Sequence, residues 1–185
     1  MAETGPSGRH RSPLTKAVAA VGSLLDPGVL LHPLRMLHYY GYAHVKPRRR
    51  ITSGGDLRIA PNATFRNGSR IDLGASVQLG ERVSLWAGKT TGRIVIGART
   101  TLGPDVFVTA ADYGLRAETR ITEQSMAEAD VIIGADCWIG TKAVITAGVT
   151  LGDGCVIGAG SVVTHDVPAG AIAAGIPARV LKMRD

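Results

Sequence analysis

The sequence predicts an all-β solenoid, a parallel β-helix built from six-residue repeats. Between Val131 and Thr164 an aliphatic residue recurs every six positions, at Ile133, Ile139, Ile145, Leu151, Ile157 and Val163. A glycine directly follows four of these residues, and a small or β-branched residue lies four positions after each of the first five. A period of six fits neither a helix nor a simple strand. It fits short strands that each point one bulky side chain inward and meet at corners made of small residues.

The same period extends toward the N-terminus with interruptions. Aliphatic or aromatic residues six apart occur at Ile59, Phe65 and Ile71, then after a slip of two at Leu73, Leu79 and Leu85, and again at Ile96, Leu102 and Val108. Residues 86–93 interrupt the pattern, and residues 109–130 form a longer insertion with seven charged side chains. A long insertion in a solenoid projects from one face and usually serves function.

These patterns divide the chain into four parts. We expect a disordered tail over residues 1–13, a helical arm with a basic linker over 14–56, the β-helix over 57–170 with its loop at 109–130, and a C-terminal extension over 171–185. Within the arm, apolar periodicity predicts short helices over 14–25 and 29–44, the second interrupted near Pro33.

Composition agrees with one domain and an aliphatic core, since 45% of the 185 residues are hydrophobic and only 4% aromatic. No apolar run reaches the ~18 residues that suggest a membrane span. Cys137 and Cys155 are eighteen residues apart, which places them on successive coils. A disulfide between them is geometrically conceivable, and free thiols are the favoured expectation for a cytoplasmic protein.

The net charge of +6 belongs to the N-terminal arm. Residues 1–50 hold eight basic and two acidic residues, and the remainder of the chain is neutral. Nucleic acid is disfavoured as a partner because no aromatic-rich basic patch accompanies the charge. Two roles stay open for residues 14–50: the helices cap the open end of the β-helix, or they rest on the inner face of a membrane and bring the protein to lipid-linked sugars.

The string DCWIGTKAVITAGVTLGDGCVIGAGSVVTHDVPAGAIAAGIPARVLK, residues 136–182, resembles the hexapeptide-repeat acyltransferases, most closely the sugar and xenobiotic O-acetyltransferase group. The resemblance covers roughly residues 57–184. It implies a left-handed β-helix, a homotrimer, and acetyl-CoA bound as the acyl donor in the groove between neighbouring subunits, with no metal.

The resemblance also implies a donor site. By position, Trp138 lines the groove, while Thr141, Ala159 and Thr164 contact the pantetheine arm and the adenine end. Arg179 and Lys182 fall where basic residues meet the phosphates of CoA, to which cations are suited.

One catalytic residue of the family is missing. A histidine of the protruding loop acts in the family as the general base, and here the position holds Ala111, followed by Asp112 and Tyr113. No histidine lies between residues 45 and 164. We expect Asp112 to replace the base or orient the acceptor and Tyr113 to donate or relay a proton. A positioned base contributes roughly 10²–10⁴-fold to rate.

Two functions follow from different classes of protein. The first is an O-acetyltransferase that acts on a sugar or sugar-containing acceptor, a small molecule or glycan, in polysaccharide biosynthesis. The alternative is a catalytically impaired β-helix trimer that serves as a binding or assembly module, because the loop histidine is replaced. A β-helix carbonic anhydrase is disfavoured, since it needs three histidines on the coils and none occurs there before His165.

Overall fold

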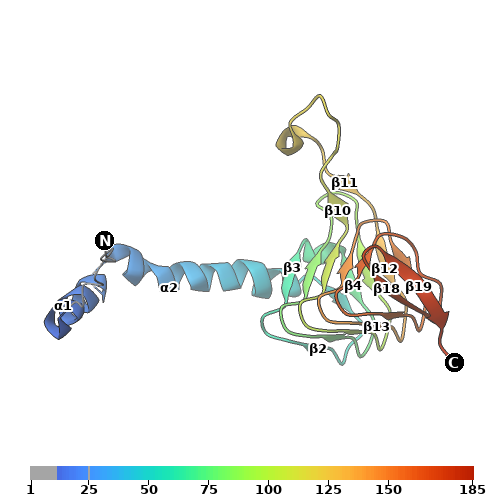
Figure 1. The fold of residues 1–185 in the computed structure, drawn as a ribbon, viewed down its shortest axis with the longest axis horizontal. Coiled ribbons are helices and arrows are strands. Elements are labelled where there is room, and N and C mark those ends of the chain that lie inside the picture. The colour runs from blue at the N-terminus through green and yellow to red at the C-terminus, as the bar shows by residue number, and fades with distance from the viewer. Residues whose placement is uncertain (1–11, 25) are drawn as a thin grey trace, which may run out of the picture. The chain divides into compact units, whose positions relative to one another are not determined.

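The computed structural model describes residues 12–24 and 26–185, so most of the expected tail lies outside the described residues. The chain divides into an arm, which ends at Tyr40, and a solenoid unit over Gly41–Asp185 (Figure 1). The described part of the arm contains α1 (Pro13–Leu24) and α2 (Pro27–Tyr40). The expected interruption near Pro33 is wrong, because α2 continues through that residue. The missing N–H of Pro33 removes one helical hydrogen bond without ending the helix.

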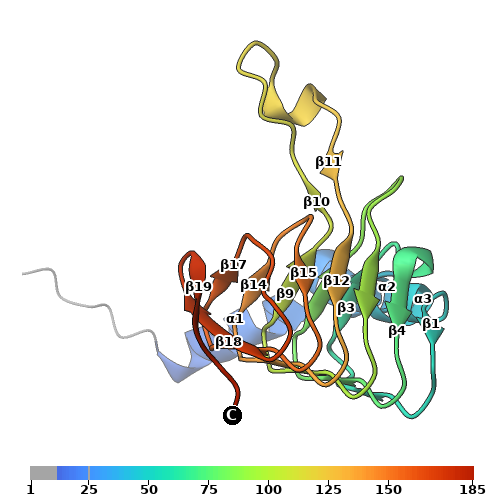
Figure 2. The same cartoon turned by 90° about the vertical axis from the view of Figure 1, so that its right-hand side faces the viewer.

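The solenoid unit winds through five coils whose strands stack into three sheets, parallel except where β19 pairs with β18 (Figures 1 and 2). Sheet A contains β1 (Thr52–Ser53), β4 (Ile71–Leu73), β7 (Ile94–Ile96), β12 (Val131–Ile133) and β15 (Thr150–Leu151). Sheet B contains β2 (Arg58–Ile59), β5 (Gln78–Leu79), β8 (Thr101–Leu102), β13 (Trp138–Ile139), β16 (Val156–Ile157), β18 (Ala171–Gly175) and β19 (Ala178–Met183). Sheet C contains β3 (Thr64–Arg66), β6 (Ser84–Trp86), β9 (Phe107–Thr109), β14 (Val144–Ile145) and β17 (Val162–Val163). The expected β-solenoid is confirmed.

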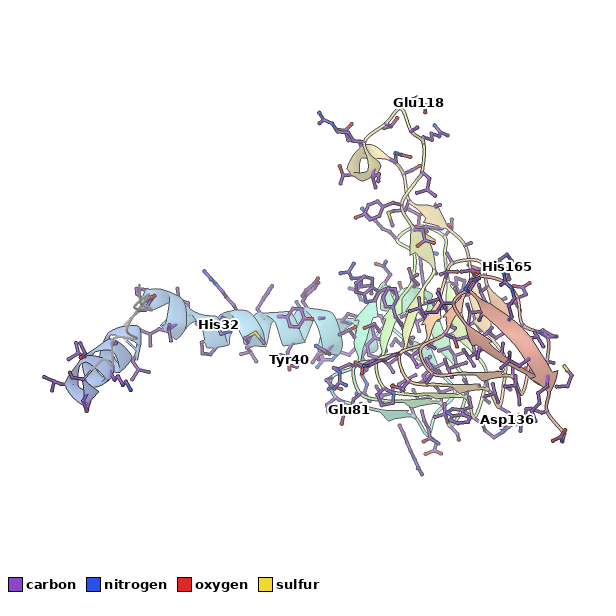
Figure 3. All side chains as sticks on the ribbon, viewed as in Figure 1. His32, Tyr40, Glu81, Glu118, Asp136 and His165 are labelled. Carbon is purple, nitrogen blue, oxygen red and sulfur yellow. The ribbon has the colours of Figure 1, made fainter. Side chains whose placement is uncertain are left out.

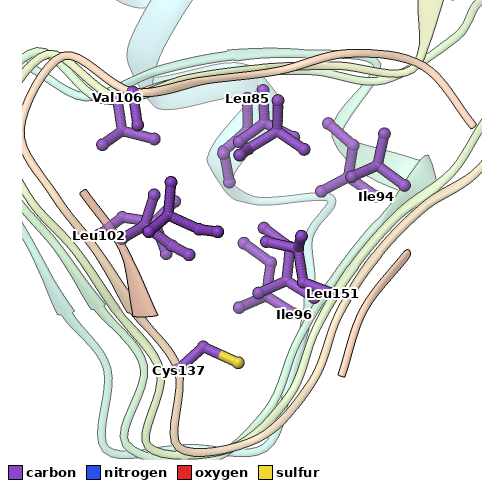
Figure 4. Close-up of a cluster of buried hydrophobic side chains, with 14 of the residues drawn as sticks. Leu85, Ile94, Ile96, Leu102, Val106, Cys137 and Leu151 are labelled. Carbon is purple, nitrogen blue, oxygen red and sulfur yellow. The ribbon is translucent and has the colours of Figure 1, made fainter. Parts of the chain in front are cut away.

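The core is the column of side chains that the six-residue period predicts. Figure 4 shows them converging inside a roughly triangular coil, and the repeated aliphatic residues from Ile133 to Val163 are all buried. The slip between Ile71 and Leu73 has a simple cause. Strands β4, β7 and β12 of sheet A are three residues long, and the side chains of their first and third residues point into the core.

The two cysteines lie in this core as free thiols on successive coils. The Cys155 thiol donates a hydrogen bond to Cys137 Sγ at 3.7 Å. This bond, together with burial, raises the pKa of the Cys155 thiol.

The first coil is covered by residues that the sequence assigned to the end of the second helix and to the basic linker. A π-helical turn, η1 (Gly41–Val45), and α3 (Lys46–Arg48) pack against β3 and a 3₁₀ turn, η2 (Gly68–Arg70). The buried His44 donates from Nδ1 to the carbonyl oxygen of Ala63 at 2.7 Å. The first strand, β1, also precedes the expected boundary at residue 57. At the other end, β19 folds back antiparallel on β18 within the segment assigned to the C-terminal extension.

Candidate functional site

A row of outward-facing side chains crosses sheet B. Trp138 on β13 pairs in register with Val156 on β16, which pairs with Ile172 on β18, which pairs with Lys182 on β19. Trp138, Val156 and Ile172 point away from the core, because their neighbours Ile139, Ile157 and Ala173 are buried, and Lys182 pairs with Ile172 on an exposed strand. Trp138 is 60% exposed. Three strand spacings of about 4.8 Å separate the two ends of the row, so an aromatic surface and a cation lie about 14 Å apart on one face.

The corner between sheets B and C lies at one edge of this row. Thr141 follows β13 there and donates from Oγ1 to the carbonyl oxygen of Pro104 at 2.7 Å, one coil below. Its own carbonyl accepts a hydrogen bond from Gly160 N at 2.8 Å, one coil above. Ala159 stands over Gly140, so near that a Cβ on Gly140 would lie 2.5 Å from Ala159 N. Thr141 and Ala159 are therefore exposed neighbours on successive coils.

The basic residues follow the same sheet. Arg179 and Lys182 lie on β19, and both are exposed. Arg179 pairs with Ala174 near the turn between β18 and β19, and Lys182 pairs with Ile172 at the end of the row. Arg179 Nη1 donates to the carbonyl oxygen of Ala178 at 3.0 Å. Five of the six predicted donor-site residues thus lie on sheet B or its corner.

Thr164 is the exception. It follows β17 at the corner between sheets C and A, where its hydroxyl lies 2.9 Å from Nδ1 of His165. Figure 3 labels His165 on the side of the solenoid from which the insertion leaves. Within one chain, Thr164 therefore stands at a different corner from Thr141 and Ala159.

The insertion leaves the solenoid at this second corner, directly after β9. Its base is a two-stranded antiparallel ribbon of β10 (Ala111–Asp112) and β11 (Ala127–Glu128), whose strands run side by side in both views (Figures 1 and 2). Asp112 pairs with Ala127 and its side chain is exposed. Tyr113 is 54% exposed. Asp112 is consequently held on the ribbon, Tyr113 directly follows it, and both side chains are open to solvent.

The tip of the insertion contains a 3₁₀ turn, η3 (Ile121–Glu123), and is organised by Gln124. The Gln124 amide accepts from Arg116 N at 2.8 Å and donates to the carbonyl oxygens of Arg116 and Thr119 at 2.9 and 2.7 Å. The side chain therefore closes the tip into a defined loop.

Glu128 is a structural anchor that the sequence did not reveal. Its carboxylate accepts backbone N–H hydrogen bonds from Lys89, Thr90, Thr91 and Gly92 at 2.6–3.1 Å, and hydroxyl bonds from both threonines. These donors, led by the Thr91 and Gly92 amides, hold the pKa of the Glu128 carboxyl far below its usual range. The contact ties the insertion to the 86–93 interruption. In the sequence, this contact is marked only by Gly88 and Gly92, which flank Lys89, Thr90 and Thr91.

An aromatic cluster borders the same corner on sheet C. The guanidinium of Arg66 lies 3.6 Å from the centroid of the Trp86 ring, and Phe107 meets Trp86 edge-on at 4.9 Å between centroids. Ala110 N, at the start of the insertion, donates to the carbonyl oxygen of Trp86 at 2.9 Å. The base of the insertion is thus supported by β6 as well as by Glu128.

Comparisons with known proteins agree with the fold. The family described as "Hexapeptide repeat of succinyl-transferase" matches residues 130–165. A maltose O-acetyltransferase from Clostridium difficile 630 is 30% identical, with a TM-score of 0.66 over 75% of this chain and 73% of that chain. A hexapeptide-repeat-containing acetyltransferase from Vibrio cholerae is 26% identical, with a TM-score of 0.66 over 75% of this chain and 77% of that one.

A more distant structure shares the fold alone. It is a variant N-acyltransferase from Bacillus cereus in complex with dTDP and coenzyme A, 20% identical, with a TM-score of 0.63 over 73% of this chain and 74% of that one. No curated protein sequence matches the chain.

Proposed function

The chain belongs to the hexapeptide-repeat acyltransferases, and from this premise we propose that it transfers an acetyl group from acetyl-CoA to a hydroxyl or amine of a sugar-containing acceptor. The observation that supports this most is the row across sheet B, which places an exposed indole at one end and a lysine at the other. The named relatives, an O-acetyltransferase and an acetyltransferase, favour acetyl as the group transferred.

The proposed donor site uses the row and its corner together. Lys182 and Arg179 attract the phosphates of CoA, for which charge-assisted hydrogen bonds are the strong contacts. The pantetheine arm follows the corner past Ala159 and Thr141, and Trp138 shields it from water on the adjoining face. The half-buried Val156 and Ile172 offer apolar surface between the two ends.

The proposed reaction is direct transfer. The acceptor hydroxyl attacks the thioester carbonyl, a C–O bond forms, and the C–S bond breaks with CoA leaving as its thiolate. Asp112 takes the proton from the attacking hydroxyl, Tyr113 relays it, and the thiolate receives it to give the free thiol. Much of the rate enhancement would come from holding the two substrates together, because orientation alone supplies several kcal/mol of the barrier.

We further propose a homotrimer that works in the cytoplasm, where acetyl-CoA is available, on precursors of polysaccharide. Asp112 and Thr164 stand at the corner between sheets C and A, whereas Trp138 and Thr141 lie on sheet B and its other corner. A ring of copies that sets the corner between sheets C and A of one subunit against the donor row of the next would bring all predicted site residues together. The two corners of a single chain do not unite them.

The test is acetyl-CoA turnover against a panel of sugars and amino sugars. We expect acceptor-dependent release of CoA by the wild type, and a kcat lower by roughly 10²–10⁴-fold in Asp112→Asn with unchanged donor affinity. Glu118→Gln, which removes another carboxylate of the same insertion, is the matched control and should retain kcat. A wild type that is inert, together with an active Ala111→His variant, would instead favour the catalytically impaired trimer.

A further inference from the structure

The arm exposes more apolar surface than a solvated linker needs. In α1, Leu14, Val18 and Val21 are 57–77% exposed, and in α2, Leu30, Leu34 and Leu37 are 60–71% exposed. α2 has no buried residue. Large exposed apolar patches mark sites of interaction with a protein or a membrane. We propose that the described arm, residues 12–24 and 26–40, binds flat on the surface of an anionic lipid bilayer.

Both helices have the geometry of an interfacial helix. The three residues of each set are spaced i, i+4 and i+7, which places them on one face. In α2, Arg35 and His32 fall on the opposite side by the same periodicity; Figure 3 labels His32 on this helix. Among residues 12–24 and 26–185, no helix is long and apolar enough to cross a membrane. An apolar stripe on a short helix with a polar back suits a position in the plane of the interface.

The charge around the helices favours anionic lipid in particular. Residues 12–50 contain six cations, Lys16, Arg35, Lys46, Arg48, Arg49 and Arg50, and a single acid, Asp26. Four of the six follow α2 within ten residues. A basic cluster that follows an amphipathic helix in the sequence is attracted by the negative surface potential of a membrane.

Aromatic residues complete the pattern at the end of α2. Tyr39 and Tyr40 meet edge-on with 6.0 Å between ring centroids, and Tyr42 follows in η1. All three are 45–55% exposed. Tyrosine prefers the level of the lipid headgroups, because its ring is apolar and its hydroxyl is polar. In the sequence the tyrosines stand between the apolar residues of α2 and the four cations of residues 46–50.

The same charge argues against a second copy of the arm as the partner that covers these apolar faces. Two arms that meet along their apolar faces would bring together Lys16 and Arg35 of each copy against one Asp26 each, a net charge of +1 per arm over residues 12–40. Such like-charge repulsion is unfavourable at low ionic strength. A lipid surface offers the complementary charge and the apolar layer together.

The test is flotation of the full chain with vesicles of phosphatidylcholine alone or mixed with phosphatidylglycerol. We expect binding to the mixed vesicles only, weakened by salt because part of the attraction is screened. Arg48→Gln/Arg49→Gln/Arg50→Gln should lower the partition coefficient by about a hundredfold, since each cation near the surface contributes about fivefold. Leu30→Ser/Leu34→Ser/Leu37→Ser should abolish flotation.

A matched control removes three exposed aliphatic side chains elsewhere. Leu115→Ser/Ile176→Ser/Leu181→Ser changes side chains of the solenoid unit that are 65–89% exposed and should float as the wild type does. Equal flotation of the α2 variant, or no flotation of the wild type on anionic vesicles at low salt, would overturn the proposal. So would a change of oligomeric state in the α2 variant without any effect of lipid, because that would identify a second copy as the occupant. None of these outcomes depends on acetyl transfer.

Discussion

Replacing Gly140 by alanine tests why the repeat needs a small residue at its corner. An ideal Cβ at this position would lie 2.5 Å from the backbone nitrogen of Ala159 and 2.8 Å from the carbonyl oxygen of Ile157. Both obstacles are backbone atoms of the next coil, so no side chain can rotate away. Gly140 N also donates to the Ile157 carbonyl at 2.7 Å, which locks the two coils together at this point.

The size of the effect follows from this geometry. Ordinary contact begins at 3.4 Å, so the coils must open by about 0.9 Å, about a fifth of the 4.8 Å strand spacing. Overpacking of this kind costs about 1–3 kcal/mol. For a chain of this length, each kcal/mol lowers Tm by about 2–4 °C, which predicts a fall of about 2–12 °C. Because Thr141 and Ala159 border the gap, affinity for acetyl-CoA should fall as well.

The assay is thermal unfolding together with calorimetric titration of acetyl-CoA. Gly22→Ala is the control, because Gly22 lies inside α1 with no atom within 4 Å of the added Cβ. That change should favour α1 by about 0.5–1 kcal/mol and leave both the solenoid Tm and the donor affinity unchanged. A Gly140→Ala protein that melts and binds as the wild type does would refute the proposed role of the corner glycine.

Two further predictions concern the core and the anchor of the insertion. Ile139→Ala should cost about 2–5 kcal/mol and Ile139→Val about 0.5–1.5 kcal/mol, because Ile139 is fully buried; urea unfolding measures both, with the exposed Ile176→Ala expected within about 0.5 kcal/mol of wild type. Glu128→Gln should destabilise the insertion, seen as faster proteolysis within residues 109–130. Since the pKa of Glu128 is lowered by folding, its ionised form contributes stability above the unfolded value near 4.3, and the contribution fades as pH falls toward the folded value. The difference in urea midpoint between wild type and Glu128→Gln should therefore be largest above about pH 5 and shrink below about pH 4; a pH-independent difference would contradict the assignment.

The inward side of the solenoid was predictable because one physical rule sets it. Each two-residue strand points one side chain into a narrow interior, so a residue such as Ile145 must be both large and aliphatic. The rule fails on sheet A, where the three-residue strands β4, β7 and β12 point their first and third side chains inward. In sheet A both Ile71 and Leu73 point inward, and the sequence alone shows this only as a slip in register.

The candidate site was less predictable because it depends on backbone rather than on side-chain patterns. Glu128 binds the backbone amides of a loop nearly forty residues earlier. Because every residue except proline has such an amide, the sequence does not show which of them a carboxylate binds. α2 passes through Pro33 because the loss of one hydrogen bond does not outweigh the rest of the helix. The separation of Thr164 from Thr141 depends on which corner each residue occupies, and a repeat of six places small residues at all three corners alike.

Calorimetric titration of acetyl-CoA into the full chain tests the central claim most directly. The donor row predicts binding in the micromolar range that is lost in Trp138→Ala and weakened in Lys182→Gln, with the fold unchanged in both because these side chains are exposed. The absence of binding to the folded wild type, or equal binding by Trp138→Ala, would contradict the donor site on sheet B and with it the proposed acetyl transfer.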